Sequence, residues 1–327
     1  MDILLFIGGL LLILGGANFL TDGAAAIAKK FGLSDFIVGL TIVSMMTSSP
    51  ELVVSLVSAF EGASSIAIGN VVGSNIFNIL VIVGLVAVIK PIKVKQGILT
   101  NDIPLVILSS IVLLVIGLSP ALGAGEMVIT RVSGIILLLF FVIFMRYTIS
   151  VAKKTNVDED ESIEEETKIK QLPIWQSILY LIGGLSALIF GGQWFVDGAT
   201  GVARGLGWSE GLIGLTIIAC GTSMPELATS VVAARKGLSG ICIGNVIGSN
   251  IFNIFLILGV SATIIPLEFG DITLFDLIVM TIASLLFWVF GKWFSKRTIN
   301  KIEGGLMLFC YIAYIVYLYL NLPSATA

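Results

Sequence analysis

The sequence predicts an all-α polytopic membrane protein with ten transmembrane helices in two inverted five-helix repeats. Of its 327 residues, 57% are hydrophobic and only 12% are charged, whereas soluble domains carry about 25% charged residues. Ten apolar stretches and one long internal repeat complete the prediction. The net charge is −3 and the chain has no long basic run, so no nucleic-acid partner is expected. The chain has no histidine, which removes the usual base of serine and cysteine hydrolases.

Each of the ten apolar stretches is about 20 residues long, the length that a helix needs to cross a bilayer. They lie roughly at 3–28, 36–59, 65–89, 103–118, 127–148, 174–203, 211–234, 239–265, 272–291 and 303–321. One connection is long, 150–172, and it carries the acidic run DEDESIEEE. We expect a solvated loop there and no calcium sensor, because the run lacks the glycine turn of an EF-hand.

Lysine and arginine are distributed unequally between alternate loops. One set of loops holds 16 of the 18 basic residues, and the other set holds only Arg131 and Arg204. The positive-inside rule therefore places the first set, with the 150–172 loop, in the cytoplasm and both termini outside the cell membrane. A wrong number of spans would scramble this alternation, so the charge distribution also supports ten helices.

A shift of 175 residues aligns two long stretches without a gap. Residues 39–79 (GLTIVSMMTSSPELVVSLVSAFEGASSIAIGNVVGSNIFNI) and 214–254 (GLTIIACGTSMPELATSVVAARKGLSGICIGNVIGSNIFNI) are identical at 26 of 41 positions. Each half contains five spans, an odd number, so the second half enters the membrane from the opposite side. The predicted units are a first repeat (1–149), an acidic cytoplasmic loop (150–172) and a second repeat (173–327). Secondary transporters often have this architecture, with the substrate site near the midplane where broken helices meet.

The second helix of each half carries a glutamate, two hydroxyl residues and a proline within an apolar stretch. Residues spaced i, i+1 and i+4 project toward one face of a helix. In the first half these are Thr47, Ser48 and Glu51, and in the second they are Thr222, Ser223 and Glu226. A charge at this depth costs at least ~2.5 kcal/mol on insertion scales, so we expect the two glutamates to be functional. The alternative is a structural pair of protonated acids hydrogen-bonded between helices.

The prolines of these motifs predict that helices 2 and 7 are broken at the site. Pro50 and Pro225 lack an N–H group, so backbone carbonyls in the preceding turn lose a donor. We expect carbonyls around 44–47 and 219–222 to be free for other ligands. Unpaired backbone at membrane depth is tolerated only where it lines a cavity or is buried in protein. Together with the side chains, these are the hard oxygen ligands that cations such as Ca²⁺ prefer.

The third helix of each half supplies further oxygen atoms. Ser74 and Asn78 are spaced i and i+4, as are Ser249 and Asn253. Four more asparagines lie on the same helices, and the sequence leaves open whether they line the cavity or serve only the structure. They are Asn70, Asn75, Asn245 and Asn250.

The paired motifs resemble the two alpha-repeats of the calcium/cation antiporter superfamily, and within it the prokaryotic sodium/calcium exchangers. The resemblance rests on TSSPEL with GNVVGSNIFN in the first half and on GTSMPEL with GNVIGSNIFN in the second. Ten spans in two inverted halves extend it over the whole chain. It implies an antiporter without a cofactor, with Ca²⁺ and Na⁺ as substrates, which works as a monomer in the lipid bilayer. It also implies that helices 1 and 6 slide past the other eight to alternate access.

The resemblance further implies a role for each matching residue. Ca²⁺ would bind Glu51 and Glu226, helped by the backbone carbonyls of Thr47 and Thr222. The inner Na⁺ position would use Ser44 (carbonyl), Thr47, Ser48, Glu51 and Ser249. The outer Na⁺ position would use Ala219 (carbonyl), Thr222, Ser223, Glu226 and Ser74. Asn78 and Asn253 would lie in the middle of the pocket, where the family sometimes has a middle Na⁺ position.

The chain departs from the family pattern at two positions. Met46 stands where the family usually has glycine before the threonine, and Gly221 keeps that glycine in the second half. Asn253 stands where some relatives have aspartate, and this argues against K⁺ co-transport.

The charge of the pocket leaves the driving ion open. Glu51 and Glu226 give two negative charges, which one Ca²⁺ or two H⁺ would cancel and which three Na⁺ would exceed by one. The serine and threonine hydroxyls suit Na⁺ and would be superfluous for protons, so we expect Na⁺/Ca²⁺ exchange. An H⁺/Ca²⁺ exchanger using the same glutamates is the nearest alternative, and a cation channel is a remote one.

Overall fold

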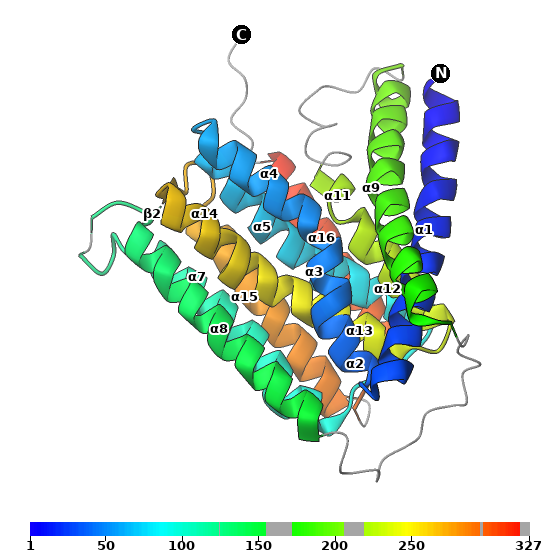
Figure 1. Cartoon of the computed structure of the whole chain (residues 1–327). Coiled ribbons are helices and arrows are strands. Elements are labelled where there is room, and N and C mark those ends of the chain that lie inside the picture. The colour runs from blue at the N-terminus through cyan, green and yellow to red at the C-terminus, as the bar shows by residue number, and fades with distance from the viewer. Residues whose placement is uncertain (124, 155–171, 206–218, 295–296, 321–327) are drawn as a thin grey trace.

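The computed structural model describes residues 1–123, 125–154, 172–205, 219–294 and 297–320, and helices dominate it (Figure 1). The helices of the first half are α1 (Asp2–Phe31), α2 (Asp35–Val38), η1 (Gly39–Val43), α3 (Ser44–Thr47), α4 (Ser49–Phe60), α5 (Ser64–Phe77), η2 (Asn78–Val83), α6 (Gly84–Ile89), η3 (Ile98–Asp102), α7 (Ile103–Gly117) and α8 (Arg131–Lys154). Those of the second half are α9 (Ile174–Gly205), α11 (Ala219–Gly221), α12 (Met224–Arg235), α13 (Ser239–Ile251), η5 (Phe252–Leu258), α14 (Gly259–Ile264), α15 (Leu274–Val289), η6 (Phe290–Phe294) and α16 (Lys301–Leu320). The η segments are short π-helical turns inside longer helices.

Eight helices in the described part of the chain are long and apolar enough to cross a membrane. A ninth span consists of Asp35–Thr47 and Ser49–Phe60, which are bent by 42° at Ser48. Of the predicted span 211–234, residues 211–218 lie outside the described residues.

Some span boundaries differ by several residues from the rough limits predicted by hydropathy. The fourth span begins at Ile98 and not at 103, because a π-helical turn containing polar side chains extends it. The fifth helix begins at Arg131 and not at 127, because β2 (Val128–Ile129) occupies the preceding residues.

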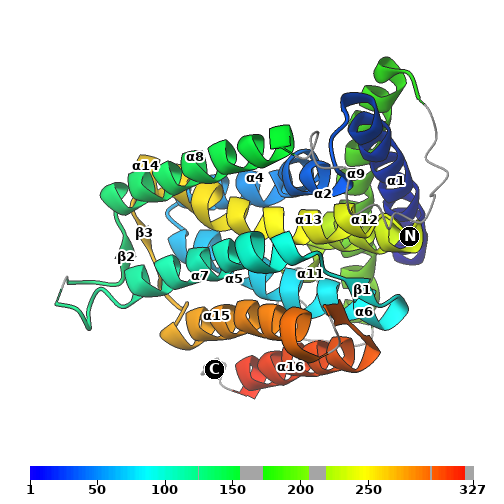
Figure 2. The same ribbon diagram turned by 90° about the horizontal axis from the view of Figure 1, so that it is seen from below.

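Helices α1 and α9 form an antiparallel pair that stands beside the rest of the molecule (Figures 1 and 2). Glycines line the seam between them: a Cβ atom at Gly16 would lie 2.7 Å from the Gly184 carbonyl oxygen, and one at Gly191 would lie 2.8 Å from the Leu12 Cβ. Small residues of this kind allow two membrane helices to approach closely. At one end of the pair, Asp22 of α1 forms an ion pair with Lys236, just after α12, at 2.6 Å.

Helix α13 lies in the centre of the remaining bundle, and its residues from Ile241 to Ile251 are all buried. It packs against α2, η1 and α3. A Cβ atom at Gly244 would lie 2.7 Å from the Leu40 nitrogen, and one at Gly248 would lie 2.6 Å from the Ser44 Cβ. These glycines therefore let the third helix of the second half reach the broken helix of the first half.

Two short antiparallel sheets join the two halves. Strand β1 (Ile92–Lys93) pairs with β4 (Thr298–Ile299), and β2 pairs with β3 (Leu267–Glu268). Each sheet thus contains one strand from each half. A two-fold relation between the halves would produce this pairing.

Candidate cation site

The two motif helices break at equivalent serines with nearly the same backbone angles. Ser48 has φ −83° and ψ 6°, and Ser223 has φ −88° and ψ 6°. The following helices, α4 and α12, each carry a proline in the first turn, where the missing N–H group has no intrahelical partner to lose. The predicted breaks in helices 2 and 7 therefore occur at the motif, and each glutamate lies in the first turn of a new helix.

The prediction that the Ser44 carbonyl is free is wrong. Its oxygen accepts the Ser48 N–H at 2.9 Å and lies 3.4 Å from the Thr47 hydroxyl. Pro50 removes only its own N–H group, so the donor at Ser48 remains available to Ser44. The Ser49 hydroxyl likewise donates to the carbonyl of Met45 at 2.8 Å. A carbonyl oxygen has two lone pairs, so Ser44 remains a candidate ligand despite its backbone bond.

Both glutamates are buried, each with 1% of its surface exposed. Neither carboxylate oxygen of Glu51 has a hydrogen-bond partner among the described residues, and the same holds for Glu226 Oε2. The remaining oxygen, Glu226 Oε1, accepts the Ser48 hydroxyl at 3.0 Å. This bond joins the motif of the first half to the carboxylate of the second.

The equivalent serine of the second half has a different partner. Ser223 donates to the Ser74 hydroxyl at 3.1 Å, and not to Glu51. The two halves thus place the same residue types at the same centre with unequal hydrogen bonds.

The asparagines and the second serine pair complete the centre. Asn78 and Asn253 are each 1% exposed, and their Oδ1 atoms have no partner among the described residues. The Asn253 amide nitrogen donates to Asn75 at 3.0 Å, which fixes the direction of its free oxygen. The Ser249 hydroxyl is also buried without a described partner. Ala219 begins α11, directly after the residues outside the described part.

Six of the ten buried side-chain atoms without a described partner belong to the predicted site. They are Glu51 Oε1 and Oε2, Glu226 Oε2, Asn78 Oδ1, Asn253 Oδ1 and Ser249 Oγ. A buried polar group without a partner costs about 1–3 kcal/mol, so such a concentration requires an explanation. All six are oxygens, the ligand type of Ca²⁺ and Na⁺. In the described ranges, no three or more His, Cys, Asp or Glu side chains lie close enough together to hold a metal ion. Hydroxyl and amide oxygens must therefore supplement the two carboxylates.

Two functional candidates had been left open by the sequence. Asn70 and Asn245 each hydrogen-bond to the backbone of the glutamate of their own half and to the threonine of the other half. The sequence singled out Asn70 and Asn245 because they occupy equivalent positions in the two repeats. A sequence repeat does not indicate which residues of the two halves contact each other.

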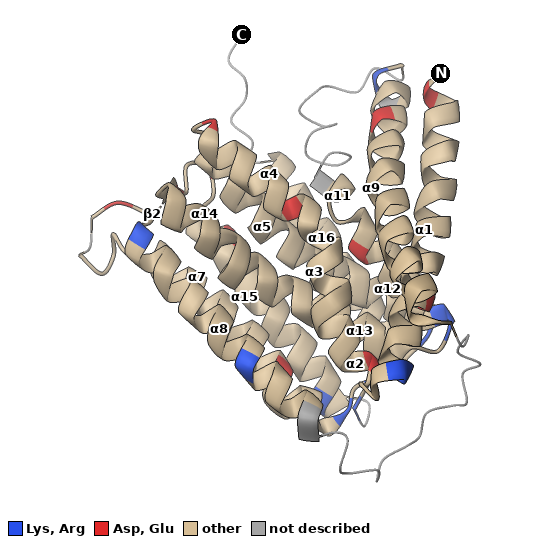
Figure 3. Cartoon of the chain, in the orientation of Figure 1, with Lys and Arg blue, Asp and Glu red and all other residues tan. Residues whose placement is uncertain are grey.

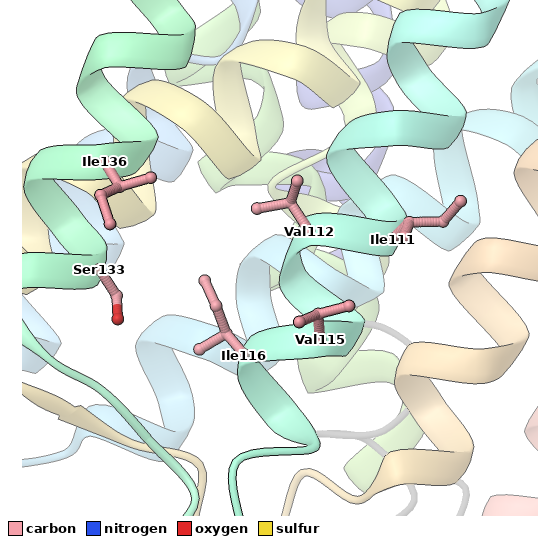
Figure 4. Close-up of a pocket in the computed structure, with 6 residues that line it drawn as sticks. All are labelled: Ile111, Val112, Val115, Ile116, Ser133 and Ile136. Atoms are coloured by element: carbon pink, nitrogen blue, oxygen red, sulfur yellow. The ribbon is translucent and has the colours of Figure 1, made fainter. Parts of the chain in front are cut away.

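A separate pocket between α7 and α8 differs from this centre in its chemistry. Figure 4 shows that it is lined by Ile111, Val112, Val115, Ile116, Ser133 and Ile136. One hydroxyl group among aliphatic side chains offers no cation site.

Comparison with known proteins identifies the family. The sequence profile of the sodium/calcium exchanger protein family matches residues 1–150 and 176–320. The chain belongs to the sodium/calcium exchanger family. This exchanger is accordingly a membrane transport protein and not an enzyme, and ions are substrates of its family and not cofactors.

Relatives of the exchanger are similar over nearly their whole length. Sodium/calcium exchanger MaX1 of Methanosarcina acetivorans is 33% identical over 97% of this chain and 98% of its own. Inner membrane protein YrbG of Escherichia coli (strain K12) is 36% identical over 86% of each chain. The solved structure of the sodium-calcium exchanger NCX_Mj soaked with 2.5 mM Na⁺ and 0.1 mM Ca²⁺ matches with a TM-score of 0.80 and 33% identity, covering 97% of this chain and 98% of that one.

Proposed function

We propose that this exchanger moves Ca²⁺ against Na⁺ by alternating access, with the Na⁺ gradient driving Ca²⁺ out of the cell. The observation that carries the proposal is a pair of buried glutamates, one from each half, among hydroxyl and amide oxygens. Their two negative charges match one Ca²⁺. The neutral hydroxyls around them suit Na⁺, which carries a single charge and needs several oxygen ligands.

The proposed ligands are the twelve residues of the two repeated motifs. They are Ser44, Thr47, Ser48, Glu51, Ser74, Asn78, Ala219, Thr222, Ser223, Glu226, Ser249 and Asn253. The printed name of MaX1 and the ions in the NCX_Mj crystals support the choice of Na⁺ and Ca²⁺.

Helices α1 and α9 are the proposed moving part. They contact each other far more than they contact the remaining bundle, and a seam of glycines holds them together. A pair bound in this way can slide as one body past the helices that carry the ligands, and so open the site to each side in turn. We expect a monomer in the bilayer to suffice, because both halves of the site come from one chain.

The proposed orientation places both termini outside the cell and the 150–172 loop in the cytoplasm. In Figure 3 most Lys and Arg positions, coloured blue, gather at one end of the molecule, toward the bottom of the view. The start of α8, which carries Arg131, and the end of α9, which carries Arg204, lie away from that end. This distribution supports the assignment by the positive-inside rule, with the repeats at 1–149 and 173–327 in opposite orientations.

A counterflow experiment with purified protein in liposomes tests the driving ion. Vesicles loaded with Na⁺ and diluted into Na⁺-free buffer at equal pH should take up Ca²⁺. Vesicles with an imposed pH gradient and no Na⁺ should take up little. Full uptake under the pH gradient would assign an H⁺/Ca²⁺ exchanger with the same glutamates. Uptake that needs no counter-ion gradient would indicate a channel.

A further inference from the structure

Asn70 of α5 bridges the two halves through its side-chain amide. Its Nδ2 atom donates to the Glu51 carbonyl at 3.3 Å and to the Ser55 hydroxyl at 3.2 Å. Its Oδ1 atom accepts the Thr222 hydroxyl at 3.4 Å. The nitrogen therefore binds the first half, and the oxygen binds the second.

Asn245 of α13 makes the same three contacts with the halves exchanged. Its Nδ2 atom donates to the Glu226 carbonyl at 3.4 Å and to the Ser230 hydroxyl at 3.1 Å. Its Oδ1 atom accepts the Thr47 hydroxyl at 3.1 Å. Because the pattern occurs twice in unequal surroundings, it is a property of the repeat and not of one local packing arrangement.

These contacts fix which way each threonine hydroxyl points. A hydroxyl group has one hydrogen and two lone pairs. When the hydrogen is donated to an asparagine oxygen, both lone pairs remain available to a cation. The Ser44 carbonyl is another acceptor near the Thr47 hydroxyl, and it lies farther away, at 3.4 Å. Donation to Asn245 thus also leaves a lone pair of Ser44 unused.

The direction of each amide is fixed by its other two contacts. Both Nδ2 hydrogens are used within the asparagine's own half, by a glutamate carbonyl and a serine hydroxyl. A rotated amide would present N–H groups to the threonine and face the glutamate carbonyl with its oxygen. Such a rotation would place the amide oxygen against the glutamate carbonyl oxygen, and two acceptors repel, so the amide oxygen stays directed at the threonine.

We propose that Asn70 and Asn245 are positioning residues that act across the repeats: each holds the threonine hydroxyl of the other half in the orientation that accepts Na⁺. This inference rests on the proposed function, in which Thr47 serves the inner Na⁺ position and Thr222 the outer one. Asn70 consequently acts on the outer position and Asn245 on the inner one. Ca²⁺ depends less on them, because its proposed threonine ligands are backbone carbonyls.

Double-mutant cycles with crossed partners test the proposal. Asn70→Ala should raise the Na⁺ concentration for half-maximal Ca²⁺ exchange about five-fold, the effect of one lost hydrogen bond, and shift the half-saturating Ca²⁺ concentration less than two-fold. In the Thr222→Val background, where no hydroxyl remains to be positioned, adding Asn70→Ala should change the Na⁺ value little further. Adding Thr47→Val to Asn70→Ala should instead multiply the effects, since that residue belongs to the other bridge. Asn245→Ala should show the reverse preference.

Controls separate a positioning role from a structural one. Ser110 and Ser284 also form a buried bond between the halves, at 3.0 Å, but on α7 and α15. Ser110→Ala and Ser284→Ala should leave the Na⁺ and Ca²⁺ dependence unchanged. Equal coupling of Asn70→Ala to both threonine variants, or no coupling to either, would overturn the proposal. Where an alanine variant fails to fold, Asn70→Ser or Asn245→Ser repeats the cycle.

The proposed function has its own arm in the same experiment. Glu51→Gln and Glu226→Gln should abolish Ca²⁺ exchange in folded protein, and wild-type exchange in both would reject the site itself. Loss of exchange in these variants without crossed coupling at the asparagines would reject only the positioning role.

Discussion

Position 46 differs from its counterpart Gly221 in size, and the structure gives this difference a location. A Cβ atom at Gly221 would overlap the side chain of Val196 on α9, so glycine there allows α9 to lie against the broken helix. In the first half, the shift of 175 residues makes Thr21 of α1 the equivalent of Val196. Met46 is partly buried and packs against the hydrophobic core. A methionine is tolerated in the first half because its flexible side chain can be accommodated there.

Gly221→Met should therefore damage transport, whereas Met46→Gly should preserve it. The larger side chain at 221 must displace Val196 and with it α9, so we expect at least a ten-fold lower rate of Na⁺-driven Ca²⁺ uptake. Met45→Gly, at an exposed neighbouring position, controls for the loss of about 1 kcal/mol of helix propensity. Unchanged uptake in Gly221→Met would contradict this steric account. A changed Na⁺ affinity in Met46→Gly would show that Met46 crowds the inner Na⁺ side.

The candidate ligands could be predicted from sequence because each is unusual in its surroundings. Glu51 and Glu226 are charges in apolar stretches, and their repetition excluded chance. The contacts between the halves could not be predicted, because the bond from Ser48 to Glu226 joins residues 178 positions apart. The bridges of Asn70 and Asn245 were missed for the same reason: an asparagine in a helix has the same local sequence whether it bridges or only fills space.

At the scale of elements, hydropathy predicted most spans and missed the π-helical turns. The turn η2 begins at Asn78, and η5 contains Asn253. Each packs against the broken helix of the opposite half, η2 against α12 and η5 against α4. Such turns are frequent at functional sites, and here each contains one of the two pocket asparagines. Their sequences, NILVIV and FNIFLIL, are ordinary apolar helix, so only the packing reveals them.

The seam between α1 and α9 gives a prediction at this scale. A Cβ atom at Gly16 would meet backbone, the Gly184 carbonyl oxygen at 2.7 Å and the Leu188 nitrogen at 2.9 Å, which cannot yield as a side chain can. Gly16→Ala should therefore push the helices apart and destabilise the protein by about 1–3 kcal/mol, measured as a lower midpoint of thermal unfolding in detergent.

The adjacent glycine provides the matched control for this substitution. A Cβ atom at Gly15 has no neighbour within 4 Å. Gly15→Ala should be neutral or stabilising, because alanine is favoured over glycine in a helix by about 1 kcal/mol. Equal midpoints for Gly16→Ala and Gly15→Ala would show that the seam does not depend on close approach.

At the scale of the whole molecule, the formal charge of the proposed site determines whether transport is electrogenic. Asn78 and Asn253 are neutral, so only Glu51 and Glu226 contribute charge. The site is then neutral with one Ca²⁺ and carries one positive charge with Na⁺ in the inner, outer and middle positions. One cycle of three Na⁺ against one Ca²⁺ moves one net charge across the membrane. Two protons against one Ca²⁺ would move none.

Membrane potential should therefore control the rate of exchange. In Na⁺-loaded liposomes with Ca²⁺ outside, each cycle carries one net positive charge outward, so an inside-positive potential should accelerate uptake and an inside-negative one should slow it. One charge is worth about 2.3 kcal/mol per 100 mV, so roughly 60 mV should change the equilibrium Ca²⁺ gradient ten-fold. Valinomycin with opposite K⁺ gradients sets the two potentials at a constant Na⁺ gradient. Equal uptake at both potentials would mean that the middle position does not take a third Na⁺, or that protons replace Na⁺ at the two glutamates.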